Sequence, residues 1–217
     1  MNSSSNIEAR DRLLLAMLPH VLFDGWSRDA LAAGQQDLKK NAPDVNLIFP
    51  GGLRDIAKHF GDYMDREMVV KLAKLDIENM PIRERISTGV RVRLDLLAPH
   101  REAIRRLLTY LSLPGNHLAG MRITLKTVDA IWHAAGDTAT DFNYYTKRGL
   151  LAGVYGSTIL YWLSDTSEAF IETQAFLDRR INEVLQIPKI QSKITRRLAR
   201  LARPLRRFAR PATAKSL

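Results

Sequence analysis

The side chains most often used in catalysis are sparse in this sequence and form no recognisable catalytic set. The chain has no cysteine, which excludes disulfides and thiolate chemistry and fits a reducing compartment. The residues that could bind a metal or move protons are scattered, with no helical ligand pair of the HExxH kind; they are His20, His59, His100, His117 and His133. No activated nucleophile or phosphate-binding loop can be recognised either. The sequence therefore predicts a protein that is not an enzyme and carries no cofactor.

The carboxy-terminal stretch, residues 189–217, combines basic and apolar side chains in a pattern that favours binding to a surface. Residues 189–217 hold ten of the 33 basic residues and none of the 23 acidic ones, so the rest of the chain is formally neutral. On a helix turning about 100° per residue, six large apolar side chains share a sector of about 80°; they are Ile190, Ile194, Leu198, Leu201, Leu205 and Phe208. The opposite arc holds Arg196, Arg197, Arg200, Arg203, Arg206, Arg207 and Arg210. This pattern is typical of a helix that lies in a membrane interface.

Two other interpretations of this tail are nucleic-acid binding and a charged solubilising arm. Both account for the arginines, but neither requires an apolar sector. Burial of the six apolar side chains, at about 1.5–3 kcal/mol each, would contribute roughly 9–18 kcal/mol at most, and each cation adds about 1 kcal/mol at an anionic surface. Pro204 is expected to kink the helix without ending the apolar stripe. We therefore predict binding to a membrane surface rich in anionic lipids, and no binding to nucleic acid.

Residues 128–155, VDAIWHAAGDTATDFNYYTKRGLLAGVY, combine polar, aromatic and small side chains. Thr140 is a suitable N-cap residue for a helix that follows it. One side of this helix would carry Tyr144, Leu151, Tyr155 and Trp162. The opposite side carries Phe142, Tyr145, Gly149, Gly153, Gly156 and Leu160. A helix that is apolar on both sides is either buried all round or has a second partner. The aromatic stripe fits a cavity wall, a protein interface or plain core packing, and the small residues fit tight helix packing or close approach of a ligand.

The same stretch resembles a known family, the lipid-binding accessory proteins of ubiquinone (coenzyme Q) biosynthesis that are numbered ninth in the Coq series. The resemblance rests on Trp132–His133, Ala135–Gly136–Asp137, Thr140–Asp141–Phe142–Asn143, Tyr145–Thr146 and Arg148, followed by Leu151–Ala152 and Tyr155. The pattern WHxAGDxxTDFNxYTxR is long and irregular, and therefore specific. Weaker similarity extends from the amino-terminal helix to about Asn182.

The resemblance implies a TetR-like helical fold that has lost DNA binding, a hydrophobic pocket for an isoprenoid quinone or its precursor, and a membrane-binding carboxy-terminal helix. We expect the pocket to be lined by Trp132, Phe142, Leu151, Tyr155 and Trp162. In this family a patch around DFNxYT docks the di-iron hydroxylase that acts on demethoxyubiquinone; by position it would comprise Asp141, Asn143, Tyr144, Tyr145 and Arg148. Tyr144 stands where the compared family member has Trp. The transit peptide of a mitochondrial version is missing, which suits a bacterial homologue.

The front of the chain resembles the helix-turn-helix head of TetR repressors. Residues 8–60 read as two helices, a short third element and a long helix. A recognition helix needs side chains that bond to base edges, flanked by cations for the phosphates. Residues 41–49, NAPDVNLIF, offer one acid, no cation and three large apolar residues. The sequence therefore predicts a degenerate head, and a TetR-like repressor with a hydrophobic ligand pocket is the alternative function.

Apolar residues recur at spacings of three and four nearly throughout, which predicts an all-α fold of about nine helices plus the amphipathic carboxy-terminal helix. The expected helices span residues 7–23, 28–39, 52–79, 81–97, 99–112, 117–135, 141–163 and 167–187, with a short turn at 44–49. Residues 1–188 form one lipid-binding domain, and 189–217 form the tail. No segment has the roughly 20 apolar residues of a membrane span. We expect a cytoplasmic homodimer, peripheral on the inner membrane, that presents a polyprenyl quinone precursor to the hydroxylase.

Overall fold

The chain folds into a small helical head and a bundle of longer helices. The computed structural model describes residues 3–137 and 142–184, without the side chains of residues 3–4 and 142–144. Every regular element within these ranges is helical, which confirms the all-α prediction. None of the helices described is long and apolar enough to cross a membrane.

The head consists of α1 (Ser3–Asp24), α2 (Arg28–Leu38) and α3 (Val45–Ile48). The bundle consists of α4 (Leu53–Leu72), α5 (Ile82–Leu97), α6 (Arg101–Ser112), α7 (His117–Ala134) and α8 (Phe142–Ser164), and residues 171–184 are also helical. Three short 3-10 turns connect these elements at Lys39–Asn41, Ala98–His100 and Glu168–Phe170.

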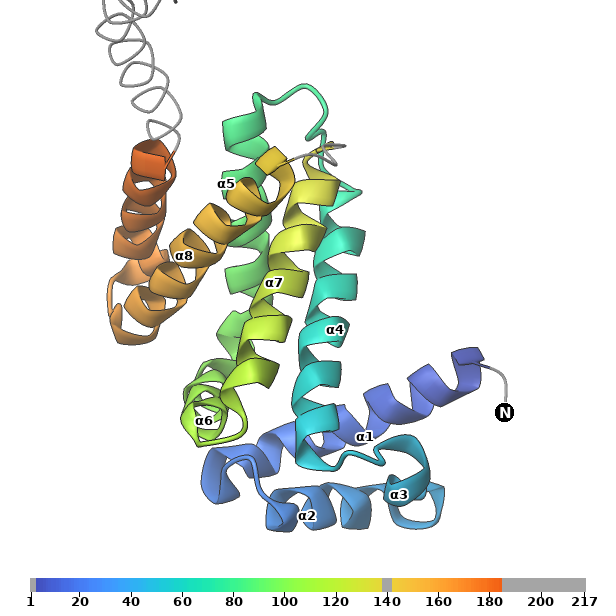
Figure 1. The fold of residues 1–217 in the computed structure, drawn as a ribbon. Coiled ribbons are helices and arrows are strands. Elements are labelled where there is room, and N and C mark those ends of the chain that lie inside the picture. The colour runs from blue at the N-terminus through green and yellow to red at the C-terminus, as the bar shows by residue number, and fades with distance from the viewer. Residues whose placement is uncertain (1–2, 138–141, 185–217) are drawn as a thin grey trace, which may run out of the picture.

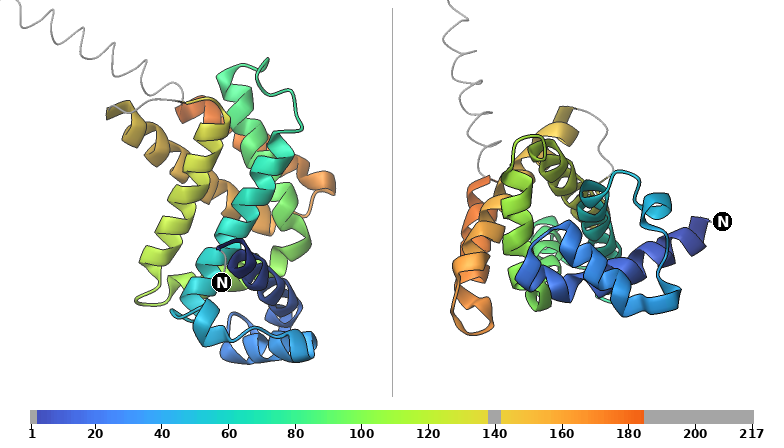
Figure 2. Two further views of the ribbon diagram at one scale, coloured as in Figure 1. Left: turned by 90° about the vertical axis from the view of Figure 1, so that its right-hand side faces the viewer. Right: turned by 90° about the horizontal axis from the view of Figure 1, so that it is seen from below.

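The helices α4, α5 and α7 run side by side, with α8 packed across α7 and the 171–184 helix at the outer edge of the bundle (Figure 1). The head lies at one end of the bundle, as the views in Figure 2 also show. The sequence of α4 explains its central place, because one apolar side chain recurs every fourth residue and each is buried: Ile56, Phe60, Met64, Met68 and Leu72. This spacing gives one continuous apolar face.

The head is held to the bundle through a turn that follows α1. Gly25 has a φ of 67°, a left-handed conformation that favours glycine, and it ends α1 directly before Trp26. The Trp26 indole is buried, donates a hydrogen bond of 2.9 Å to the carbonyl of Ala103 in α6 and meets Phe60 edge to face at 5.6 Å. The turn between α1 and α2 therefore positions the head against α4 and α6.

The predicted helix boundaries differ most from the structure at the end of α4; α1 also begins four residues before the predicted position, and the last described helix begins four residues after it. The helix expected over residues 52–79 ends at Leu72, and a series of turns then leads into α5. Ile77 in this loop is half-buried and packs against the core. Arg85 closes the loop by donating to the carbonyl of Met80 at 2.8 Å. Tertiary packing therefore overrides local helix propensity in this segment.

A buried carboxylate organises the turn between α8 and the 171–184 helix. Asp165 accepts hydrogen bonds from the N–H and hydroxyl of Ser167, at 2.8 and 2.6 Å, and from the N–H and hydroxyl of Thr173, at 2.8 and 2.5 Å. Burial alone would raise the pKa of Asp165, but these bonds favour the charged form and hold its pKa well below the usual range. The carboxylate thus fixes where the last described helix starts.

Asp165→Asn is expected to lower the free energy of unfolding at pH 7 by roughly 2–3 kcal/mol, because the amide loses charge-assisted hydrogen bonds. Since the folded-state pKa lies below the unfolded value, this stabilisation is present above about pH 4 and is lost as the pH falls toward the folded pKa. Urea titrations should therefore show the difference from wild type shrinking below about pH 4. The control is Asp24→Asn at the exposed end of α1. Equal stability of Asp165→Asn and wild type at pH 7 would contradict this account.

Candidate functional site

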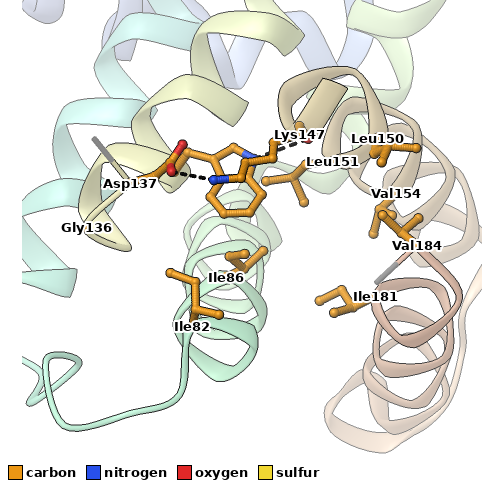
Figure 3. A pocket seen from close by; sticks show the side chains of 11 residues that line it. Ile82, Ile86, Gly136, Asp137, Lys147, Leu150, Leu151, Val154, Ile181 and Val184 are labelled. Carbon is orange, nitrogen blue, oxygen red and sulfur yellow. Dashed lines mark hydrogen bonds and ion pairs between the residues drawn. The ribbon is translucent and has the colours of Figure 1, made fainter. Parts of the chain in front are cut away.

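An apolar cavity lies where α5, α7, α8 and the 171–184 helix meet, and we call it the tryptophan cavity. Its volume is about 400 Å³, and it is lined by Ile82, Ile86, Trp132, Gly136, Asp137, Lys147, Leu150, Leu151, Val154, Ile181 and Val184. Figure 3 shows the two isoleucines of α5 facing Ile181 and Val184 across the cavity, with the apolar side chains of α8 above them. Its interior is therefore made of hydrocarbon and indole.

The polar edge of the tryptophan cavity follows from the way α7 ends. Gly136 has a φ of 86°, which favours glycine, and a Cβ there would lie 3.2 Å from the guanidinium of Arg85. Its N–H donates to the carbonyl of His133, and the N–H of Asp137 donates to the carbonyl of Trp132, both at 3.0 Å. These two bonds form a Schellman motif. The motif places Asp137 at the cavity edge, where its carboxylate pairs with Lys147 (Figure 3).

Charged groups from α7 and α8 complete this edge. Lys147 Nζ lies 2.7 Å from a carboxylate oxygen of Asp137 and 5.4 Å from the ring centre of Trp132, and the Trp132 indole donates to the Lys147 carbonyl at 3.3 Å. Arg148 pairs with Asp129 at 2.6 Å and lies 3.4 Å from Asp137. The interior can bury hydrocarbon at about 25 cal/mol per Å², and the edge can bond a polar group. This arrangement suits an amphiphile with an apolar chain and an oxygenated end.

The five side chains predicted to line one lipid pocket lie in different surroundings. Trp132 and Leu151 line the tryptophan cavity. Tyr155 lines a second cavity that shares no lining residue with the first. Trp162 is fully buried in the core, at 0% exposure, and lines neither cavity. The side chain of Phe142 lies outside the described residues.

The sequence did not single out the walls contributed by Ile82, Ile86, Ile181 and Val184. These residues sit at ordinary helical core spacings, and nothing in the sequence separates them from other apolar positions. Ile181 and Val184 become cavity walls because the turn at Asp165 leads from α8 into the 171–184 helix, and Ile82 and Ile86 of α5 face them across the cavity. Finding them requires the tertiary arrangement.

The surface predicted to dock an enzyme lies at the start of α8. Tyr145 is 74% exposed, whereas Arg148 is 9% exposed and its guanidinium pairs with Asp129 of α7. Asp141 and the side chains of Asn143 and Tyr144 lie outside the described residues. Among the described members of this patch, Tyr145 is the accessible side chain and Arg148 fixes the start of α8 against α7.

Part of the second apolar side of α8 is not covered by the described part of the chain. Gly149 and Gly153 are exposed, and a Cβ added at either position meets no atom within 4 Å. Leu160, further along this side, is 63% exposed. The helix is therefore not buried all round, which leaves this side open to a partner. The predicted membrane-binding side chains of residues 189–217 lie outside the described residues.

Comparison with known proteins connects this chain to one family. The COQ9 family model matches residues 118–188, which include α7, α8 and the 171–184 helix. The chain is 33% identical over 190 residues to the rat protein named "Ubiquinone biosynthesis protein COQ9, mitochondrial", covering 84% of this chain and 61% of the relative. The human protein of the same name is 31% identical, covering 84% of this chain and 59% of the relative. The chain thus spans about three fifths of the length of these curated relatives.

The fold has a solved counterpart among transcriptional regulators. A TetR transcriptional regulator from Nitrosomonas europaea superposes with a TM-score of 0.64 at 20% identity, covering 81% of this chain and 97% of the regulator. At this identity the likeness concerns the fold, and it confirms the predicted TetR-like architecture. The family match over most of α7 and all of α8, together with the similarity to the rat and human proteins, shows that this chain is similar to the COQ9 family.

Proposed function

We propose that this protein is a non-enzymatic accessory protein of ubiquinone biosynthesis. In this proposal it binds a polyprenyl quinone precursor and presents it to a modifying enzyme, the demethoxyubiquinone hydroxylase. Its curated relatives are named for ubiquinone biosynthesis. The observation that carries the proposal is the tryptophan cavity, which combines hydrocarbon walls with a charged edge.

The physical problem is that a long isoprenoid cannot leave the bilayer unless its apolar surface is buried elsewhere. At about 400 Å³, the tryptophan cavity is near the lower end of the range of about 300–1,000 Å³ for ligand sites. We therefore propose that it shelters the ring and the first isoprenoid units while the remaining chain stays in lipid. Trp132 and Leu151 would contact the apolar parts, and Lys147 and Asp137 the oxygenated end.

The proposal assigns lipid binding to residues 1–188 and membrane attachment to residues 189–217. The 171–184 helix forms one cavity wall and leads along the chain toward the tail, so the cavity and the membrane contact are neighbours in sequence. We propose that the protein is peripheral on the cytoplasmic face of the inner membrane and that it forms a homodimer, the commonest assembly of soluble oligomers.

A chain that ends at Pro188 is expected to lose co-sedimentation with anionic liposomes, whereas most of the full-length protein should sediment with them. The reason is that the truncation removes the six apolar side chains and the arginine arc of the tail. Raising the salt concentration should weaken binding of the full-length protein, because surface charges are screened. Equal sedimentation of the two chains would show that the tail is not the membrane anchor.

Changing Tyr144 and Tyr145 together to alanine is expected to weaken co-purification with the hydroxylase by at least tenfold, because aromatic side chains often dominate the binding free energy of interfaces. Tyr145 is exposed, so its loss should leave the fold intact. The matched control is Phe23→Ala, which removes an aromatic ring that is 79% exposed on α1 at the other end of the molecule. If the double variant and the control retain the enzyme equally, the docking assignment is wrong.

The second candidate function is a TetR-like repressor, and the structural neighbour favours it. In the head, however, α3 is a single turn capped by Asp44, and Ile48 and Phe49 are buried. Few of its side chains could therefore reach base edges. A repressor should retard its operator more strongly than random DNA in a salt-dependent way. We expect no such preference.

A further inference from the structure

A further cavity opens at the surface between the start of α4 and the first turns of α7, and we call it the basic cavity. Its volume is about 350 Å³, within the range of about 300–1,000 Å³ for ligand sites. The charged side chains that line it are Arg54, Asp55, Lys58 and Arg122. It shares no lining residue with the tryptophan cavity, so the two can be altered separately.

Positive charge dominates the wall of the basic cavity. Arg54, Lys58 and Arg122 have no ion-pair partner in the part of the chain that the structure describes. The carboxylate of Asp55 accepts a hydrogen bond of 2.7 Å from the N–H of Gly51. Three cations and one carboxylate leave an excess of two positive charges among the described lining residues.

The next turn of the same two helices has the opposite arrangement. Asp62 of α4 pairs with Lys126 of α7 at 2.6 Å. Lys58 and Arg122 each stand four residues before a member of this pair, one helical turn earlier, and both line the basic cavity. At this level both helices contribute a cation, and like charges that face one cavity repel each other. An anion held between them would replace this repulsion by two attractive contacts.

The donors and their charge indicate which anion fits. A guanidinium offers N–H donors that match two oxygens of a phosphate, and an ammonium binds phosphate as a point charge. A phosphate monoester carries about two negative charges near neutral pH. It therefore balances the two excess positive charges of the wall, whereas a carboxylate or a phosphate diester, with one negative charge, would balance half of them.

The surroundings have room for the organic part of such a phosphate. Arg54 also lines an adjoining cavity of about 690 Å³, whose wall includes the polar side chains of Arg28, Gln35 and Asn46. On the α7 side the basic cavity is bordered by Leu118, which is about half-exposed. A polar group would extend along Arg54, and an acyl chain would extend over Leu118.

We infer that the basic cavity is a binding site for a doubly charged phosphate group, held between Lys58 of α4 and Arg122 of α7 with Arg54 beside them. The phosphate belongs either to a free phosphate ester or to the head group of an anionic lipid. This inference does not depend on the proposed function, because it involves no residue of the tryptophan cavity or of the tail.

The experiment is calorimetry on the full-length protein at low salt, with glycerol 3-phosphate as the probe. Lys58→Gln with Arg122→Gln should weaken binding about tenfold or more, because two charge-assisted contacts to the phosphate are lost. Both side chains are exposed, so the fold should be retained. Lys71→Gln with Arg83→Gln is the matched control, because it lowers the net charge equally at exposed positions outside the basic cavity.

The control variant should bind glycerol 3-phosphate as tightly as the wild type does. Equal weakening in the two double variants would reduce the effect to overall charge and overturn the inference, as would the absence of binding to the wild type. Dimethyl phosphate, which carries one negative charge, should bind the wild type about tenfold or more weakly than glycerol 3-phosphate. Equal binding of these two probes would also contradict a site for a doubly charged group.

Two further probes identify the source of the phosphate. Dihexanoyl phosphatidic acid has the same phosphate monoester as glycerol 3-phosphate and adds two acyl chains. If it binds more tightly, and Lys58→Gln with Arg122→Gln removes this binding, the phosphate belongs to a lipid head group; equal affinity of the two probes assigns the site to a free ester. Retardation of random duplex DNA that is lost in this variant and kept in the control would assign the cations to a nucleic-acid backbone and overturn the inference.

Discussion

Asp65→Leu alone is expected to lower the free energy of unfolding by about 3–5 kcal/mol, because it leaves the guanidinium of Arg93 buried without its counter-charge. Both side chains are nearly inaccessible to water, and their closest atoms are 3.3 Å apart. The Thr127 hydroxyl would also lose the carboxylate to which it donates. This is among the largest effects that a single substitution in the described residues should have.

Adding Arg93→Met to Asp65→Leu is expected to restore most of the lost stability. Replacing a whole buried ion pair by apolar side chains is often neutral, since the desolvation cost of both charges disappears with their attraction. Urea denaturation of the single and double variants should show this non-additivity directly. If Asp65→Leu costs less than about 1 kcal/mol, the pair is not desolvated as the structure describes.

Filling the tryptophan cavity is expected to weaken binding of a quinone precursor with a short isoprenoid chain by at least tenfold. Ile82→Trp with Val184→Trp places two large rings on facing walls, so they occupy the volume that the ligand would need. Ile82 is half-exposed and Val184 is partly exposed, so the protein should still fold. Calorimetry in mild detergent measures the change in Kd.

The matched control places the same two rings outside the cavity. Val70 in α4 and Ile171 at the start of the 171–184 helix are both exposed, and neither lines the tryptophan cavity. Val70→Trp with Ile171→Trp adds the same apolar surface, so it accounts for non-specific adsorption of the ligand. Equal loss of affinity in both double variants would mean that the tryptophan cavity is not the binding site.

The sequence predicts helices well here because each apolar face is local and periodic. The spacing of buried residues in α4, the turn at Gly25 and the end of α7 at Gly136 all follow from neighbours in sequence. The end of α4 at Leu72 does not, because it depends on the packing of Ile77 against distant helices. Helix propensity alone therefore predicts a longer helix here than the tertiary structure contains.

The site was predictable in part for the same reason. Trp132 and Leu151 stand out in a specific motif, and both line the tryptophan cavity. Trp162 lies on the same side of the helix in projection, but it is fully buried in the core. A helical projection shows which way a side chain points and does not show how deeply it is buried. Arg93 and Asp65 are 28 positions apart in two helices, and nothing in either helix alone marks them as a buried pair.

The central claim, that the protein carries an isoprenoid quinone precursor in the tryptophan cavity, is tested most directly by mass spectrometry of the lipids that purify with it. Full-length wild type, Ile82→Trp/Val184→Trp and the control Val70→Trp/Ile171→Trp would be purified from cells that make ubiquinone, and their lipids extracted. The account predicts a quinone or precursor in wild type and control, and a loss of most of it in the cavity-filled variant. Equal amounts in all three proteins, or no isoprenoid quinone in the wild type, would contradict it.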